Sequence, residues 1–235
     1  MASLNALLVA GSDTEVGKTV VTSALLAYGQ RHHPQRSLAV LKPVQSGVGD
    51  GELYQRLFFP QVPLATLMPQ AFQAPLAPPL AAALEHRTVD LGQIWQTLTD
   101  LTRRHDWVLV EGAGGLGSPV TDEFTLADLA AAWHLPLVLV VPVKLGAIAQ
   151  AVANVALARQ TGLDLRGIIL NCAQPLPADQ IDQWAPIPLI TNLTQVPVLG
   201  VMPHLSDPES APALVAAAQG LILEPLYPRA TGVSP

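Results

Sequence analysis

Short apolar runs alternate along the chain with longer segments whose apolar residues recur at helical spacing. The runs occupy residues 6–10, 38–41, 107–110, 136–141, 165–170 and 196–201. The helical segments occupy residues 17–30, 91–104, 126–133 and 148–160. Runs this short suit buried strands, and strands that alternate with helices are typical of parallel sheets. We therefore expect an α/β fold, a doubly wound, mostly parallel sheet with helices on both faces.

Prolines interrupt this alternation between residues 59 and 79. The six prolines in this segment exclude a long helix or a central strand. Because the segment is apolar and has no Gly/Ser run, we expect a long ordered loop at the edge of the sheet and not a linker between domains. Residues 1–225 then form a single domain, and residues 226–235 form a frayed tail.

Composition narrows the possible partners and the cellular location. The formal net charge is −6 and there is no block of Lys or Arg, so we expect no nucleic-acid or membrane partner. The single cysteine, Cys172, excludes an internal disulfide and a cysteine-based metal cluster. The N-terminus lacks the features of a signal peptide, and the apolar run 135–143 is too short to span a bilayer. These features predict a cytoplasmic protein.

The loop after the first apolar run has the pattern of a phosphate-binding loop. Residues 11–19 read Gly-Ser-Asp-Thr-Glu-Val-Gly-Lys-Thr and lie between a predicted strand and a predicted helix. Gly17 lets backbone N–H groups surround phosphate oxygens, Lys18 reaches the terminal phosphates and Thr19 offers a hydroxyl to Mg²⁺. Five residues, not four, separate Gly11 from Gly17, so the loop is a variant of the strict pattern; the alternative is a β–α turn with a chance Gly-Lys-Thr.

Two further charged residues follow predicted strands. Glu111 precedes the glycine-rich stretch 112–115, and Lys42 begins the stretch Lys-Pro-Val-Gln-Ser-Gly. Ligands of open α/β sheets bind at the carboxyl ends of the strands, so we expect Glu111 beside the phosphate loop as a Mg²⁺ ligand and Lys42 facing the same crevice. The alternative is that each is a solvated charge at a strand end. Two lysines, a carboxylate and a phosphate loop at one rim suit phosphoryl transfer.

Four motifs together resemble the dethiobiotin synthetase family, whose fold is a single-domain P-loop NTPase. They are the loop 11–19, the stretch 42–47, the stretch 110–115 and the Val-Lys-Leu-Gly of residues 143–146, and they occur in the family's order. The resemblance extends from the N-terminus to about Pro203. It implies an ATP-dependent ligase of biotin biosynthesis that joins 7,8-diaminopelargonic acid (7,8-diaminononanoate) and CO₂ into a cyclic urea, through a carbamate and a carbamic–phosphoric anhydride.

The resemblance also implies roles for individual residues. The catalytic residues would be Lys18, Lys42, Thr14 and Ser46, and the Mg²⁺ ligands Thr19, Asp50 and Glu111. ATP would contact Asp13, Thr14, Glu15, Val16, Gly17, Lys18, Thr19, Asn171 and Pro203, with Asn171 reading the adenine and Pro203 flanking it. The diamine would lie against Ser46, Glu111, Gly114 and Gly146. Ala149 stands where the family can have a polar residue, so the backbone N–H groups of the helix after Gly146 would hold the substrate carboxylate.

Two other classes share part of these motifs. A cobyrinate-type amidotransferase has a related phosphate loop, but this chain has no room for a glutaminase domain. A nucleotide-switched partitioning ATPase usually carries a further lysine early in the loop, where this chain has Ser12 and Asp13.

The resemblance further implies a homodimer with the diamine near the subunit boundary. The predicted helix 148–160 supports this, because Ala147, Ile148, Ala151, Val152 and Val155 give it more apolar surface than one sheet contact needs. The alternative is that this helix is buried within one chain.

Overall fold

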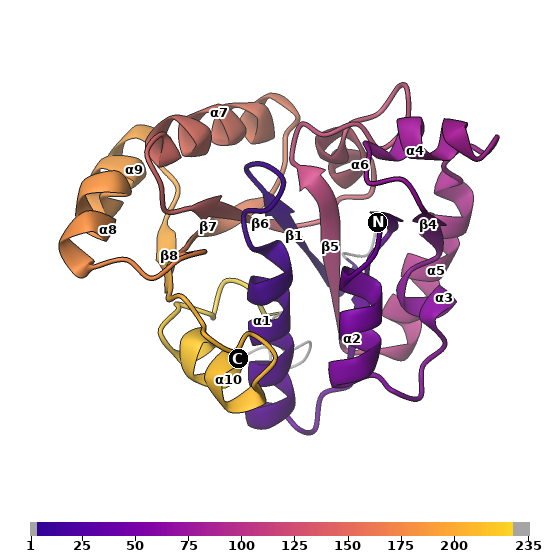
Figure 1. Cartoon of the computed structure of the whole chain (residues 1–235), viewed down its shortest axis with the longest axis horizontal. Helices are drawn as coiled ribbons and strands as arrows, with labels where there is room; N and C mark the ends of the chain where they lie inside the picture. The colour runs from indigo at the N-terminus through magenta and orange to yellow at the C-terminus, as the bar shows by residue number, and fades with distance from the viewer. Residues whose placement is uncertain (1–3, 228–235) are drawn as a thin grey trace, which may run out of the picture.

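The computed structural model of the chain describes residues 4–227. Its main sheet contains six parallel strands in the order β2-β5-β1-β6-β7-β8 (Figure 1). They are β1 (Ala6–Gly11), β2 (Leu38–Leu41), β5 (Trp107–Gly115), β6 (Leu137–Pro142), β7 (Leu165–Asn171) and β8 (Val198–Met202). Each contains or overlaps one of the apolar runs of the sequence. The parallel sheet expected from the alternating pattern is therefore confirmed.

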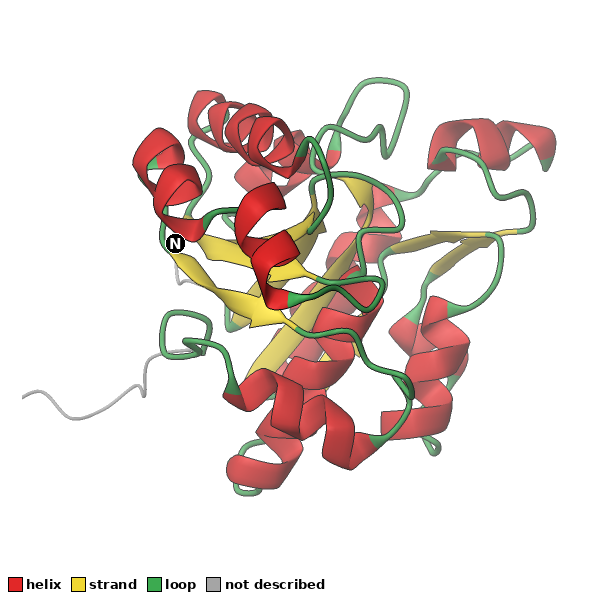
Figure 2. Ribbon diagram, turned by 60° about the vertical axis from the view of Figure 1, so that its left-hand side comes forward, coloured by secondary structure: helices red, strands yellow, loops and turns green. Residues whose placement is uncertain are grey.

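Helices cover both faces of this sheet, as Figure 2 shows. They are α1 (Lys18–His32), α2 (Asp50–Phe58), α3 (Leu64–Leu67), α4 (Pro78–Leu84), α5 (Leu91–Arg104), α6 (Leu126–Ala132), α7 (Ala147–Gln160), α8 (Ala178–Trp184), α9 (Ile187–Thr194) and α10 (Ala211–Gln219). Alternate residues of β1 separate the two cores. Leu7 and Val9 pack with α1 and α10, whereas Leu8 and Ala10 pack with α5, α6 and α7. This is the doubly wound arrangement that the sequence predicts.

The first helix, α1, is buried on most of its surface. The buried residues include Val21, Ala24, Leu25, Leu26 and Ala27, because α1 packs both against the sheet and against α10. This double cover fixes the helix whose first residue, Lys18, follows the phosphate loop.

The proline-rich segment is more structured than the sequence predicts. In place of a continuous loop over residues 59–79 it contains the short helix α3, the strand β4 (Gln70–Phe72) and the start of α4. β4 pairs in parallel with β3 (Val44–Ser46) as a second, two-stranded sheet. Prolines lie at the first residue of α4 and between these elements, positions at which proline removes no needed N–H donor.

The packed part of the chain extends beyond the expected boundary at residue 225. Leu226 is buried, and the ring of Tyr227 lies 4.4 Å, centroid to centroid, from that of Trp107. These contacts contradict a frayed tail that begins at residue 226; residues 228–235 of that predicted tail lie outside the described residues. Over residues 4–227, no helix is long and apolar enough to cross a membrane.

Candidate active site

The phosphate loop connects the end of β1 at Gly11 to the start of α1 at Lys18 (Figure 1). Gly17 precedes the helix with φ 89° and ψ 27°, a left-handed conformation that glycine adopts without steric cost. A Cβ at this position would lie 2.0 Å from Nδ2 of Asn171, so the close approach of Asn171 requires glycine as well. Nδ2 of Asn171 donates a hydrogen bond of 2.9 Å to the carbonyl of Val16. The end of β7 thus supports the C-terminal half of the loop.

Lys18 is buried at the base of the loop. Its Nζ donates a hydrogen bond of 3.2 Å to the carbonyl of Asp13, while the carboxylate of Asp13 accepts one of 2.7 Å from the N–H of Thr14. Burial lowers the pKa of Lys18, against the attraction of Glu111. A partly desolvated ammonium interacts more strongly with a phosphate than a solvated one does.

Three neighbouring elements bring Lys42, Asp50 and Glu111 together. Leu41 of β2 pairs with Val110 of β5, so the next residues, Lys42 and Glu111, lie side by side. Nζ of Lys42 lies 2.7 Å from Oε1 of Glu111 and 2.6 Å from Oδ2 of Asp50, the first residue of α2. The side chains of Lys42 and Glu111 are 5% and 1% exposed, so the pair is removed from solvent, whereas the Asp50 side chain is 34% exposed and can reach a ligand.

Thr19 joins this cluster from the first turn of α1. Its Oγ1 lies 3.0 Å from Oδ1 of Asp50 and 3.1 Å from Oε1 of Glu111. The structure therefore brings together Thr19, Asp50 and Glu111, the three side chains that the resemblance gives as magnesium ligands.

The charges of the cluster stabilise one another. Burial alone would disfavour the ammonium of Lys42, but the attraction of Glu111 and Asp50 outweighs it and raises the pKa of Lys42. Burial likewise disfavours the Asp50 carboxylate, and the Lys42 ammonium outweighs it and lowers the pKa of Asp50. Both groups therefore carry their charges around neutral pH.

The donor set suits Mg²⁺. Magnesium prefers oxygen ligands and usually takes one or two carboxylates, with the remaining positions filled by water and substrate phosphates. Thr19, Asp50 and Glu111 offer three oxygens around one point beside the phosphate loop, close enough together that Lys42 reaches both carboxylates. Among the described residues no group of three His, Cys, Asp or Glu side chains could hold a metal without substrate oxygens.

Comparison with known proteins identifies the family. An AAA-domain family model matches residues 5–211. The chain is 52% identical to the ATP-dependent dethiobiotin synthetase of Gloeothece citriformis over 95% of its length and 99% of the relative's, and 54% identical to that of Crocosphaera subtropica over 95% and 100%. This chain belongs to the ATP-dependent dethiobiotin synthetase family. The resemblance seen in the motifs is confirmed, and with it the class of activity, an ATP-dependent ligase of biotin biosynthesis.

Solved structures of other proteins show the same fold. The chain superposes on MinD in the MinC:MinD cell division complex of Aquifex aeolicus with a TM-score of 0.55, 12% identity and coverage of 92% and 86% of the two chains. A ParA family ATPase of Chlorobium tepidum gives a TM-score of 0.53 at 12% identity, with coverage of 94% and 92%. At this identity the likeness shows the P-loop NTPase fold alone, and the choice of dethiobiotin synthetase rests on the sequence relatives.

Tyr54 is a residue of this dethiobiotin synthetase site that the sequence reasoning missed. It is fully buried on α2, and its hydroxyl donates a hydrogen bond to Oε2 of Glu111. Burial and the nearby Glu111 raise the pKa of Tyr54 well above its usual range, so it remains a donor. The signal was available, because Tyr54 follows Asp50 by four residues and therefore shares its helix face.

The remaining predicted residues lie at different distances from the cluster. Ser46 ends β3, and its Oγ is buried without a hydrogen-bond partner among the described residues. Gly114 has φ 68°, and a Cβ there would lie 2.3 Å from Oγ of Ser118 and 3.7 Å from Thr14. Pro203 is exposed after β8, three strands from β1, and is not brought into the cluster.

The helix after Gly146 is tied to the phosphate loop, which the sequence did not indicate. Gly146 is exposed before α7, and β6, which precedes it, is a neighbour of β1. From α7, Oε1 of Gln150 accepts a hydrogen bond of 3.1 Å from Oγ of Ser12, and Nδ2 of Asn154 donates one of 3.3 Å to the Ser12 carbonyl. The start of α7 is therefore held in register with the loop of the synthetase.

Proposed function

We propose that this chain converts 7,8-diaminopelargonic acid, CO₂ and ATP into dethiobiotin, ADP and phosphate. The observation that carries the proposal is the position of the Lys42 ammonium between Asp50 and Glu111, beside Thr19 and the phosphate loop. This arrangement gathers positive charge and oxygen ligands where transferring phosphoryl oxygens would lie.

The reaction needs no covalent enzyme nucleophile. One substrate amine attacks the carbon of CO₂ and loses a proton, giving a carbamate. A carbamate oxygen attacks the γ-phosphorus of ATP, the bond to the bridging oxygen breaks, and ADP leaves. The second amine attacks the resulting carbamic–phosphoric anhydride at its carbonyl carbon and loses a proton to solvent, and phosphate leaves as the ring closes. Because this last attack is intramolecular, holding the substrate in position supplies much of the rate.

The residues of the site divide this work. Lys18 and Lys42 neutralise charge on the γ-phosphate and the carbamate, and Thr14 and Ser46 orient the diamine with Gly114 and Glu111. Thr19, Asp50 and Glu111 would hold Mg²⁺, which supplies charge neutralisation to the phosphate oxygens when bound. The loop from Asp13 to Thr19 cradles the phosphates through its N–H groups.

The nucleotide base would lie toward the end of β7. The hydrogen bond from Asn171 to the Val16 carbonyl, which holds Asn171 against the phosphate loop, supports this role. Glu15 and Pro203 are proposed to border the nucleotide, each exposed and free to contact it.

A homodimer would complete the part of the site, at the start of α7 after Gly146, where we expect the substrate carboxylate to bind. The apolar residues expected at the interface need correction, because Ala147, Ala151 and Val155 are buried against the chain's own core. Of the expected residues, Val152 is exposed. Leu145, just before α7, and Ile187, Leu189 and Leu193 of the neighbouring helix α9 add further exposed apolar side chains. We propose that two copies meet over this α7/α9 surface and that the enzyme works in the cytoplasm.

A single assay tests the reaction. Purified chain, MgATP and bicarbonate are incubated with and without the diamine, and phosphate release is measured beside mass spectrometry of the product. We expect phosphate release to require the diamine and to match formation of the cyclic urea. Equal release without the diamine, or stimulation by DNA or glutamine instead, would reject the proposal in favour of a partitioning ATPase or an amidotransferase.

A further inference from the structure

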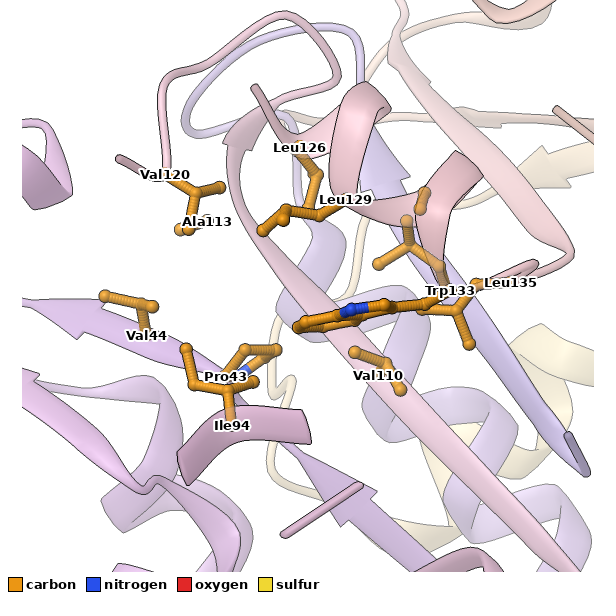
Figure 3. Close-up of a pocket in the computed structure, with 12 residues that line it drawn as sticks. Pro43, Val44, Ile94, Val110, Ala113, Val120, Leu126, Leu129, Trp133 and Leu135 are labelled. Carbon is orange, nitrogen blue, oxygen red and sulfur yellow. The ribbon is translucent and has the colours of Figure 1, made fainter. Parts of the chain in front are cut away.

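A small apolar cavity lies beneath the predicted substrate site. Its volume is about 20 Å³, and side chains of β1, β5, α5, α6 and the segment before β3 surround it (Figure 3). Pro43 and Val44 form one side, Ala113 and Val120 lie above them, and the Trp133 indole extends across the cavity. The fold thus leaves a space between the main sheet and α6 that the core does not fill.

The size and polarity of the cavity limit what it can hold. About 10–15 Å³ in this measure suffices for one water, so the cavity admits a molecule of a few atoms and not the alkyl tail of the diamine. The indole nitrogen of Trp133 is the one polar side-chain atom among the described residues that line it. A water needs two to four polar partners, and an anion such as bicarbonate would be buried without a counter-charge. A small uncharged, apolar molecule fits best.

Two strands place this cavity directly beside the reacting residues. Pro43 and Val44 lie between Lys42 and Ser46, and Ala113 lies between Glu111 and Gly114. Val44 and Ser46 are two residues apart on β3 and so share a face, and the buried Ser46 hydroxyl has no partner among the described residues. A hydrogen-bond donor without a partner is therefore available two residues from the cavity-lining Val44.

We propose that this cavity is a binding site for CO₂, which holds the gas until a substrate amine attacks it. The inference rests on the proposed function, since the ligand is the carbon source of that reaction. In the step, the amine lone pair forms the N–C bond, one C=O electron pair moves to oxygen, and the amine proton passes to solvent. The new carbamate is charged, so it leaves the apolar cavity for Ser46 and Lys42, which favours the forward direction.

Filling the cavity tests the proposal. Ala130 of α6 is buried and lines the cavity, whereas Ala131 beside it does not, so Ala130→Val and Ala131→Val form a matched pair. We expect Ala130→Val to raise the KM for CO₂ roughly tenfold, with the KM values for ATP and diamine and the kcat at saturating CO₂ unchanged. Ala131→Val should match the wild type. CO₂ is supplied as bicarbonate equilibrated with carbonic anhydrase, and Val120→Ile serves as a second filling variant if Ala130→Val folds poorly.

Xenon provides a readout that does not depend on turnover. In crystals under xenon pressure we expect a xenon atom among Val44, Ala113 and Trp133, and in solution xenon should inhibit competitively against CO₂ and not against ATP. An unchanged KM for CO₂ in both filling variants, or xenon bound without competition, would overturn the CO₂ site. A wild-type protein that forms no cyclic urea would instead overturn the proposed function, so the two failures are distinguishable.

Discussion

The two ends of the proposed active site differ in how far one chain completes them. At the phosphate end, Lys42, Asp50, Glu111 and Thr19 form contacts of 2.6–3.1 Å. Lys42 directly follows β2, and the others lie on α2, β5 and α1. At the carboxylate end, Leu145 and Gly146 are exposed, and a Cβ on Gly146 would meet nothing within 4 Å. The phosphate end therefore has a fixed geometry before substrate binds. At the carboxylate end, the backbone N–H groups after Gly146 remain accessible to a ligand and, in the proposed dimer, to the second copy.

The largest effect should come from removing charge at the phosphate end. Lys42→Ala should reduce turnover by roughly 10²-fold or more, because the transferring phosphoryl group loses a fixed cation. The variant leaves Asp50 and Glu111 unpaired, so Mg²⁺ should raise its melting temperature more than that of the wild type. Arg103→Ala, which removes an exposed surface charge, is the control. Near wild-type turnover in Lys42→Ala would show that the cluster is structural.

The second test addresses the open end. Leu145→Asp places a charge on the α7/α9 surface and should shift the protein from dimer to monomer, with the KM for the diamine raised about tenfold or more. The affinity for MgATP should stay unchanged, because the phosphate end is complete in one chain. Sedimentation equilibrium and steady-state kinetics measure both. A wild-type protein of 24.8 kDa at micromolar concentration with full activity would show that the open end needs no partner.

A third test examines the hydrogen bond from Tyr54 to Glu111 at the phosphate end. Tyr54→Phe removes the hydrogen bond that orients Glu111, so the affinity for Mg²⁺ should fall about tenfold while kcat at saturating Mg²⁺ falls less. Mn²⁺ binding followed by electron paramagnetic resonance gives the affinity without turnover. Tyr28→Phe, on the far half of α1, is the matched control. Equal metal affinity in both variants would mean that Tyr54 only fills space.

A smaller effect on nucleotide binding is expected from Asn171, which contacts the phosphate loop from the end of β7. Asn171→Ala removes the donor to Val16 and a proposed base contact, so nucleotide affinity should fall several-fold. Turnover at saturating ATP should stay closer to normal. Isothermal titration with ADP and initial-rate kinetics separate the two quantities. Abolished turnover with unchanged affinity would reject the base-reading role.

The smallest effect concerns acid stability. The pKa of Asp50 is lowered in the folded protein, so near its ordinary value of 3.8 the unfolded chain binds more protons than the folded one. The free energy of unfolding therefore decreases as the pH is lowered through this range. Asp50→Asn should therefore reduce the slope of unfolding free energy against pH between about pH 2 and 4, measured by urea denaturation. Gly146 and Leu145, at the open end, carry no titratable side chain and contribute no such slope. An unaltered slope in Asp50→Asn would mean that the Lys42 contact is lost before unfolding.

The sequence predicts the main sheet well because each strand carries its own apolar run. Leu38–Leu41 was expected as a strand and is one, with every residue buried. α3 and β4 were missed because pieces of four and three residues are too short for any period to show. The face of α7 that packs against the sheet could not be predicted either. A helix with apolar residues on nearly all faces does not show from sequence which face is buried.

The sequence predicts which charged residues lie at the carboxyl ends of strands, but not which of those strands are neighbours in the sheet. Glu111 and Lys42 were each expected at a carboxyl end, but the pairing of Leu41 with Val110, which makes them neighbours, is set by the sheet. Tyr54 was missed because no helix over residues 50–58 was predicted, so its position four residues after Asp50 could not be interpreted as a shared helix face. The hydrogen bonds from α7 to Ser12 depend on a tertiary contact between segments more than 130 residues apart.

The position of β5 between β1 and β2 has a consequence for co-translational folding of the enzyme. Glu111 lies 92 residues after Thr19 and 69 after Lys42, so a growing chain exposes its lysines, Asp50 and phosphate loop long before Glu111 emerges. Closing loops of this length is slow compared with local helix formation. Nascent chains arrested before β5 should therefore contain α1 without nucleotide affinity, and affinity should rise only in chains arrested after residues 115 and 171 have both left the exit tunnel.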